Sequence, residues 1–82
     1  MITVRVLLFG HLKDVLPRGE TTLALSDGAT AQGAADALAL RDARLAGLFA
    51  KARVAVGGVF ADADTKLAGG DEIAFLPPMS GG

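Results

Sequence analysis

The sequence contains no cysteine, and its only histidine is His11. Without cysteine the chain can form no disulfide, no thiol nucleophile and no thiolate metal ligand. One histidine cannot supply a histidine ligand set, so no metal site is predicted. No serine has a plausible base either, and His11 is interpreted as a surface or capping residue. The chain is therefore not expected to carry a catalytic constellation of its own.

The sequence also lacks an excess of charge of one sign and lacks long apolar runs. Its formal net charge is −1, which gives no electrostatic argument for binding nucleic acid or a membrane. No apolar run approaches the roughly 18 residues of a membrane span, and the first residues do not resemble a secretory signal. A soluble, cytoplasmic protein is predicted. The loosely grouped Arg41, Arg44, Lys51 and Arg53 are interpreted as a solvated face, with a docking patch for an acidic partner as the alternative.

Apolar residues alternate along several stretches, and this alternation predicts β-strands. The chain has 82 residues, enough for one domain with a modest core. Strands are predicted over residues 2–9, 21–25, 53–56, 59–60 and 71–76. The pair Gly57-Gly58 is interpreted as the hairpin turn between two of these strands rather than as a phosphate-binding loop.

One main helix is predicted over residues 31–40, with Thr30 as its N-cap. Shorter helical segments are predicted over residues 11–16 and from Asp42 to Ala52. These elements favour an α+β fold, in which a mixed sheet of about four to five strands packs on one main helix. The predicted centre of the core is Val4, Val6, Leu38, Ile73 and Phe75.

A second set of apolar residues has the opposite parity on the predicted strands. Leu7 and Phe9 in the first strand and Ala74 and Leu76 in the last should point away from the core, and Phe60 is a further candidate. A single helix covers only one face of a sheet, so these residues are predicted to form an exposed partner-binding patch. The alternative is that the loop over 62–70 or the segment over 42–52 folds over them.

The sequence finishes with Pro77-Pro78-Met79-Ser80-Gly81-Gly82. Residues 1–78 are predicted to form the folded domain, and residues 79–82 a flexible tail. Proline favours an extended path, and glycine has no Cβ, so a Gly-Gly tail can enter a channel too narrow for other residues. Four extended residues reach about 13–14 Å. The alternative is a glycine-capped terminus without a role.

These features together resemble a known family. Val6-Leu7-Leu8-Phe9, Thr30, and the run from Gly70-Asp71-Glu72 through Pro77-Pro78 to Gly81-Gly82 are similar to the small subunit of molybdopterin synthase, which has a ubiquitin-like β-grasp fold. The resemblance implies that an activating enzyme adenylates Gly82 with ATP and that a sulfur donor converts it to a thiocarboxylate. It further implies that a large synthase subunit, in a heterotetramer, uses this sulfur to build the dithiolene on cyclic pyranopterin monophosphate.

The resemblance also assigns roles to residues. Gly82 would bear the adenylate and then the thiocarboxylate, and Gly81 would keep the tail narrow. The partner contacts would be Phe9, Phe60 and Leu76, followed by Pro77, Pro78, Met79 and Ser80. Catalytic side chains are expected on the large subunit, and this chain is expected to bind no cofactor itself. Gly57 departs from the family, in which many members have asparagine.

Two other readings of the sequence stay open. One is a related carrier, which serves thiamine synthesis or tRNA thiolation or is attached to proteins as a ubiquitin-like modifier. The other is a plain interaction domain with an inert tail.

Overall fold

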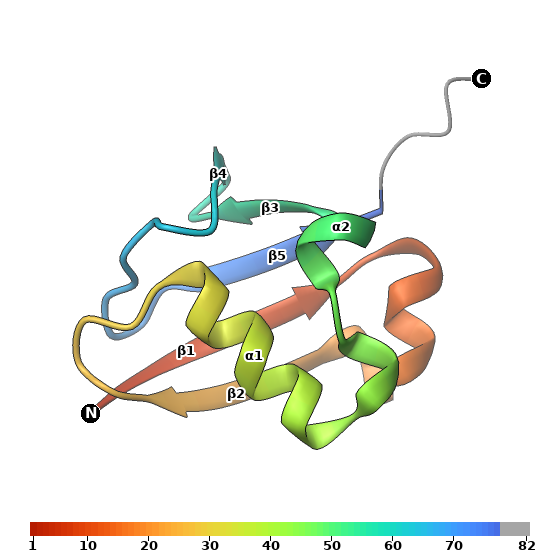
Figure 1. Cartoon of the computed structure of the whole chain (residues 1–82), viewed down its shortest axis with the longest axis horizontal. Coiled ribbons are helices and arrows are strands. Elements are labelled where there is room, and N and C mark those ends of the chain that lie inside the picture. Colours follow the sequence, from red (N-terminus) through yellow and green to blue (C-terminus); the bar gives the residue numbers. More distant parts are fainter. Residues whose placement is uncertain (78–82) are drawn as a thin grey trace.

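The computed structural model describes residues 1–77, except for the side chains of His11 and Pro17. Five strands and one main helix form a single two-layer unit (Figure 1). The strands are β1 (Ile2–Leu8), β2 (Glu20–Leu25), β3 (Arg53–Val56), β4 (Val59–Ala61) and β5 (Glu72–Leu76). The helices are α1 (Ala31–Arg41) and α2 (Leu48–Lys51), with 3-10 helices η1 (Gly10–Val15), η2 (Pro17–Gly19) and η3 (Ala43–Leu45).

The strands form one mixed sheet in the order β2-β1-β5-β3-β4. The first and last strands lie side by side and run parallel, with Val6 opposite Ile73, whereas all other neighbours are antiparallel. Helix α1 crosses one face of this sheet (Figure 1). The predicted α+β architecture is therefore confirmed.

Helix α1 begins at the predicted N-cap. The Thr30 hydroxyl accepts a hydrogen bond from the Gly33 N–H at 3.3 Å, as a capping threonine does. The Ala31 and Gln32 N–H groups donate to carbonyls of the loop over residues 62–70, at 2.9 and 3.0 Å. The N–H groups of the first three residues of α1, which have no partner inside the helix, are thus all bonded within the chain, so none of these three is left to bind an anion.

The core lies between α1 and the sheet. The five residues predicted for its centre, Val4, Val6, Leu38, Ile73 and Phe75, are each at most 1% exposed. Leu45 and Leu48 complete this layer, and the half-buried Phe49 ring meets the Phe75 ring edge-on at a centroid distance of 6.1 Å. Leu67 anchors the loop over 62–70 in the same cluster. The segments that could have covered the opposite face therefore pack on the helix side.

Several predicted strand boundaries were wrong by one residue, and the predicted short helical segments differ in type or continuity. Strand β1 ends at Leu8, because Phe9 is the N-cap of the 3-10 helix η1, where an α-helical segment was expected. The segment after Asp42 is not continuous, because Gly47 adopts a left-handed conformation at φ 71° and separates η3 from α2. Strand β4 runs one residue further than predicted, to Ala61.

Candidate partner-binding face and its chemistry

The face of the sheet opposite α1 carries a row of apolar side chains. Leu7 of β1 is opposite Ala74 of β5, Ala74 is opposite Ala55 of β3, and Ala55 is opposite Phe60 of β4. Directly opposed residues in adjacent strands place their side chains on the same face. This row therefore crosses four of the five strands on the face that α1 leaves uncovered.

The row continues toward the end of β5. The Phe9 backbone is extended, at φ −116° and ψ 164°, so the alternation of β1 continues through this residue. Its N–H donates to the Phe75 carbonyl at 3.1 Å, which holds Phe9 next to the end of β5, where Leu76 points to the same face. Phe9 is 44% exposed and Phe60 is 63% exposed. We call Leu7, Phe9, Ala55, Phe60, Ala74 and Leu76 the outer apolar strip.

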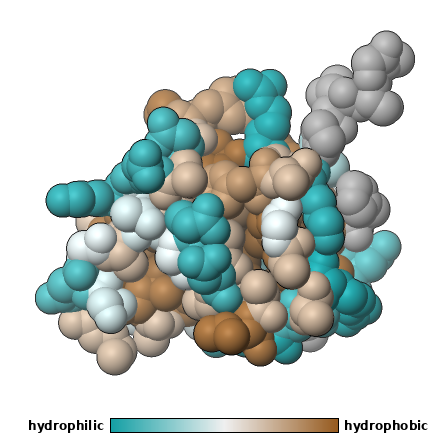
Figure 2. All heavy atoms as spheres, viewed as in Figure 1, coloured by the Kyte–Doolittle hydropathy of each residue, from teal (hydrophilic) through white to brown (hydrophobic). Residues whose placement is uncertain are grey.

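The predicted patch residues thus share one face, as expected from their parity. Sequence reasoning missed one member, Ala55, which lies in this row but is buried, at 9% exposure. Its position between the inward residues Val54 and Val56 was the available signal. The opposite, helix-bearing face is mixed, with hydrophilic groups interspersed among apolar ones (Figure 2).

The other half of the uncovered face is charged. The Arg5 guanidinium donates to the Glu20 carboxylate at 2.8 Å and lies 3.9 Å from the Glu72 carboxylate. The hydrogen bond and the charge of Arg5 lower the pKa of Glu20, and the same contact raises the pKa of Arg5. A partner that covers the outer apolar strip would therefore meet a charged border on the β2 side.

The tail begins at the edge of the outer apolar strip. Pro77 follows Leu76 directly and packs against Gly10 at the start of η1. This contact is so close that a Cβ added to Gly10 would lie only 2.5 Å from the Pro77 Cγ. The predicted roles of Pro78, Met79, Ser80, Gly81 and Gly82 fall outside the described residues and stay predictions. The described part of the chain thus places the root of the tail beside Phe9 and Leu76.

The basic residues do not form one docking patch. Arg44 pairs with Asp42 at 2.6 Å and lowers the pKa of that carboxyl through hydrogen bonds from its side chain and its backbone N–H. Arg41 donates to the Thr21 hydroxyl at 2.9 Å, and Lys51 donates to the Arg44 carbonyl at 3.4 Å. Arg53 behaves differently, because its guanidinium lies over the Phe60 ring, with Cζ 4.5 Å from the ring centroid.

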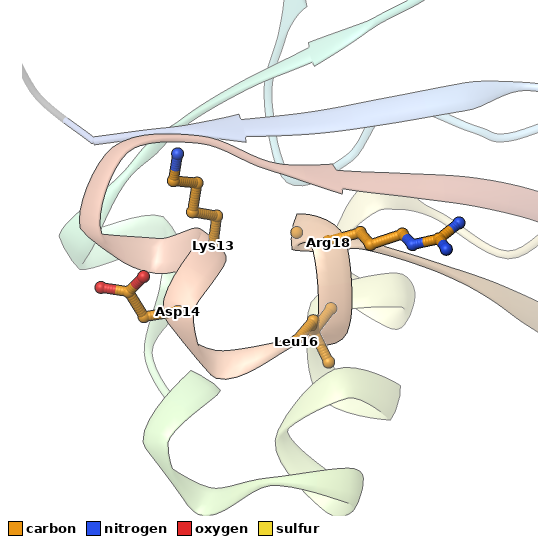
Figure 3. Close-up of a pocket in the computed structure, with 5 residues that line it drawn as sticks. Lys13, Asp14, Leu16 and Arg18 are labelled. Atoms are coloured by element: carbon orange, nitrogen blue, oxygen red, sulfur yellow. The ribbon is translucent and has the colours of Figure 1, made fainter.

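A hollow lies beside η1 and η2, away from the outer apolar strip. Figure 3 shows that the side chains of Lys13, Asp14 and Arg18 point in different directions around it, so they do not converge on one ligand. Among residues 1–77, no group of three or more histidine, cysteine or acidic residues could hold a metal ion. In the same range no helix is long and apolar enough to cross a membrane. The outer apolar strip and the tail root are therefore the strongest candidate site.

The fold and this site define a ubiquitin-like β-grasp protein with an uncovered apolar sheet face. Residues 6–82 match the ThiS family, and the chain belongs to this family. The match includes all of the outer apolar strip and extends to Gly82. A comparison with curated proteins found no match.

Solved structures of three similar proteins have the same fold. SAMP1 from Haloferax volcanii is 27% identical, with a TM-score of 0.84, over 98% of this chain and 99% of that chain. The putative molybdopterin converting factor subunit 1 from Pyrococcus furiosus is 21% identical, with a TM-score of 0.85, over 96% of this chain and 100% of that chain. Subunits 1 and 2 of the Helicobacter pylori molybdopterin-converting factor form a complex, whose matching chain is 24% identical, with a TM-score of 0.71, over 99% of this chain and 100% of that chain. The last two likenesses show the fold alone.

Proposed function

We propose that this protein is the sulfur-carrier subunit of a molybdopterin synthase and that Gly82 carries the sulfur as a thiocarboxylate. The observation that carries this proposal is the outer apolar strip, which reaches the root of a Pro-Pro to Gly-Gly tail on a ThiS-family fold. An apolar face of this kind fits a protein partner. The tail that starts at its edge is then directed toward that partner.

The chemistry of the tail explains why activation is needed. A terminal carboxyl group has a pKa of about 3.3–3.7, so it is ionised at neutral pH and is a poor electrophile. In the proposed first step, a carboxylate oxygen of Gly82 attacks the α-phosphorus of ATP on an activating enzyme, and pyrophosphate leaves. A sulfur nucleophile at the oxidation level of sulfide then attacks the acyl carbon, and AMP leaves. The absence of cysteine is consistent with a carrier that never holds sulfur on a side chain.

The second half of the proposed reaction takes place in the large subunit. That subunit binds the outer apolar strip, receives the tail in its active site and supplies the catalytic side chains. The thiocarboxylate sulfur forms a bond to a carbon of cyclic pyranopterin monophosphate and displaces an oxygen from that carbon. Water then attacks the Gly82 acyl carbon, which breaks the acyl carbon–sulfur bond, restores the Gly82 carboxylate and leaves the sulfur on the pterin. Two such transfers build the dithiolene. The Helicobacter pylori complex of subunits 1 and 2 supports this choice of partner.

A second candidate function has separate support. SAMP1, whose structure is also described as small archaeal modifier protein 1, is similar to this chain over almost its whole length. A modifier would use the same acyl-adenylate but would pass the Gly82 carbonyl to a lysine amine of another protein, with loss of the activating group. A sulfur carrier for thiamine synthesis or tRNA thiolation would share the thiocarboxylate but not the large-subunit partner.

Intact-mass spectrometry separates these functions. The proposed carrier, isolated from its own cells, should contain a fraction whose mass reflects the exchange of one oxygen for one sulfur, located on the C-terminal peptide. A modifier should instead appear as covalent conjugates on other proteins. If neither species is found, Gly82 is not activated and the proposal fails.

A reconstituted assay tests the pathway. It contains the full chain, the activating enzyme, ATP, a sulfur donor, the large subunit and the pterin precursor, and it measures dithiolene formation. Deletion of Gly82 should abolish the product, because it moves the carboxylate back by about 3.3–3.6 Å from both reaction sites. Normal dithiolene formation by this variant would disprove the assignment of the sulfur to Gly82.

A further inference from the structure

We propose that Arg53 determines partner specificity by binding a carboxylate on the surface that covers the outer apolar strip. This inference rests on the proposed function and adds a chemical requirement to the partner. The requirement is an acidic side chain opposite the β3–β4 edge, next to the apolar contact made by Phe60.

The position of Arg53 follows from the sheet register. Arg53 is opposite Leu76 on β5, so its side chain has the same parity as the outer apolar strip. Its guanidinium carbon lies 4.5 Å from the centroid of the Phe60 ring, and this ring is 63% exposed. A guanidinium over an aromatic face is attracted by the ring electrons, while its N–H groups stay available around its edge. Arg53 is thus held at the border of the strip with its hydrogen-bond donors still usable.

Arg53 differs from Arg5 and Arg44, which are both in ion pairs. Arg5 is paired with Glu20 at 2.8 Å, and Arg44 is paired with Asp42 at 2.6 Å. Within residues 1–77 no ion pair involves Arg53. Asp62 lines a hollow together with Arg53 and Phe60, but its Oδ1 already accepts from the Asp64 N–H at 3.2 Å and from the Thr65 hydroxyl at 3.3 Å.

A carboxylate is the group that this geometry selects. A partner docked on Phe60 and Leu76 would remove water from the Arg53 guanidinium, and an unpaired charge in such a place is strongly unfavourable. The planar guanidinium matches the two oxygens of a carboxylate, which can accept two parallel hydrogen bonds. An apolar or basic partner surface at the same place would be rejected. Phe60 supplies contact area that suits many partners, whereas Arg53 discriminates between an acidic partner surface and an apolar or basic one.

The test measures the affinity of the full chain for its cognate large subunit by calorimetry. Arg53→Gln should lower the affinity by about 10-fold or more, since the variant leaves the partner carboxylate without a counter-charge. Arg53→Lys should restore only part of this loss, because lysine has the charge but not the planar fork. The matched control is Lys66→Gln, which removes one exposed positive charge from the loop beside Thr30 and should change the affinity less than twofold.

The salt dependence distinguishes a carboxylate contact from mere support of the Phe60 ring. With a carboxylate partner, the difference between the wild type and Arg53→Gln should shrink as salt is raised, because ions screen the pair. A difference that stays constant with salt would assign Arg53 a packing role and overturn the inference. Unchanged affinity in Arg53→Gln, with a complex that still forms, would overturn it while leaving the proposed function intact. If the wild type forms no complex with the large subunit, both proposals fail.

Discussion

At the scale of single residues, the buried face of α1 consists mostly of small side chains. It presents Ala31, Ala34 and Ala35 to the sheet, together with a single large side chain, Leu38. Alanine lets the helix approach the strands closely but buries little apolar area per residue. Leu38, which has no measurable exposure, therefore provides a large share of the contact between the two layers.

Replacement of Leu38 should expose this dependence. We expect Leu38→Ala to lower the free energy of unfolding by about 2–5 kcal/mol, measured by urea denaturation, because a cavity is left between α1 and the sheet. The control is Leu40→Ala in the same helix, where the side chain is 90% exposed, and it should change stability by less than about 0.5 kcal/mol. Equal effects of the two substitutions would contradict the packing described here.

Phe9 and Leu76 should have the opposite behaviour. We expect Phe9→Asp or Leu76→Asp to weaken binding to the large subunit by about 2 kcal/mol or more, as loss of an interface anchor does, with a smaller effect on the free energy of unfolding. Leu40→Asp introduces the same charge at an exposed site outside the outer apolar strip and should leave binding unchanged. A large drop in melting temperature with unchanged affinity would place Phe9 and Leu76 in the core.

At the scale of elements, the start of α1 is coupled to the loop over residues 62–70. A backbone N–H of the loop donates a hydrogen bond to the Ala29 carbonyl, and two loop carbonyls accept from the Ala31 and Gln32 N–H groups. Thr30 also forms an antiparallel β-bridge with Lys66. Thr30→Ala should lower the free energy of unfolding by roughly 1 kcal/mol, because the Gly33 N–H loses its acceptor. Thr30→Ser keeps the hydroxyl and should cost clearly less. Identical values for the two variants would show that the cap contributes nothing.

The contact between β1 and β2 should make stability sensitive to acid. The pKa of Glu20 is lowered in the folded protein by Arg5, so this ion pair contributes fully above the unfolded pKa of about 4.3. The contribution is lost as the pH falls through the folded pKa. A double-mutant cycle with Arg5→Gln and Glu20→Gln should therefore give a favourable coupling at neutral pH that declines below about pH 4. A coupling that is independent of pH would rule out the charged pair as its source.

The same elements show what the sequence could predict. Alternation was enough for the strands, because large aliphatic and aromatic residues recur at every second position on the buried face, and Thr30 was enough for the start of α1. The break at Gly47 could not be predicted, because a glycine inside a helical pattern is compatible with either conformation. Ala55 was missed because alanine is common on both sides of a sheet. The cation–π contact of Arg53 depends on the register between β3 and β4, which the sequence of either strand does not specify.

At the scale of the whole molecule, folding and carrier chemistry are expected to be separable. Among residues 1–77, the core is built from side chains between Val4 and Phe75, and we expect the proposed carrier group to lie outside it. Gly81→Val should therefore change the free energy of unfolding by less than about 0.5 kcal/mol and yet abolish sulfur transfer in the reconstituted assay, because a branched side chain blocks a narrow channel. Gly81→Ala, with a single methyl group, should retain more activity. Full activity of Gly81→Val would exclude a channel that admits only backbone.

The parallel pairing of β1 with β5 has a mechanical consequence. Tension applied between the start of β1 and the end of β5 pulls the two strands along their length in opposite directions. The hydrogen bonds between them, which include the Phe9 to Phe75 bond, are then loaded together in shear instead of opening one after another from one end. If the proposed partner pulls on the end of β5 while the start of β1 is held, the load falls on these hydrogen bonds in shear, and we expect the domain to stay folded.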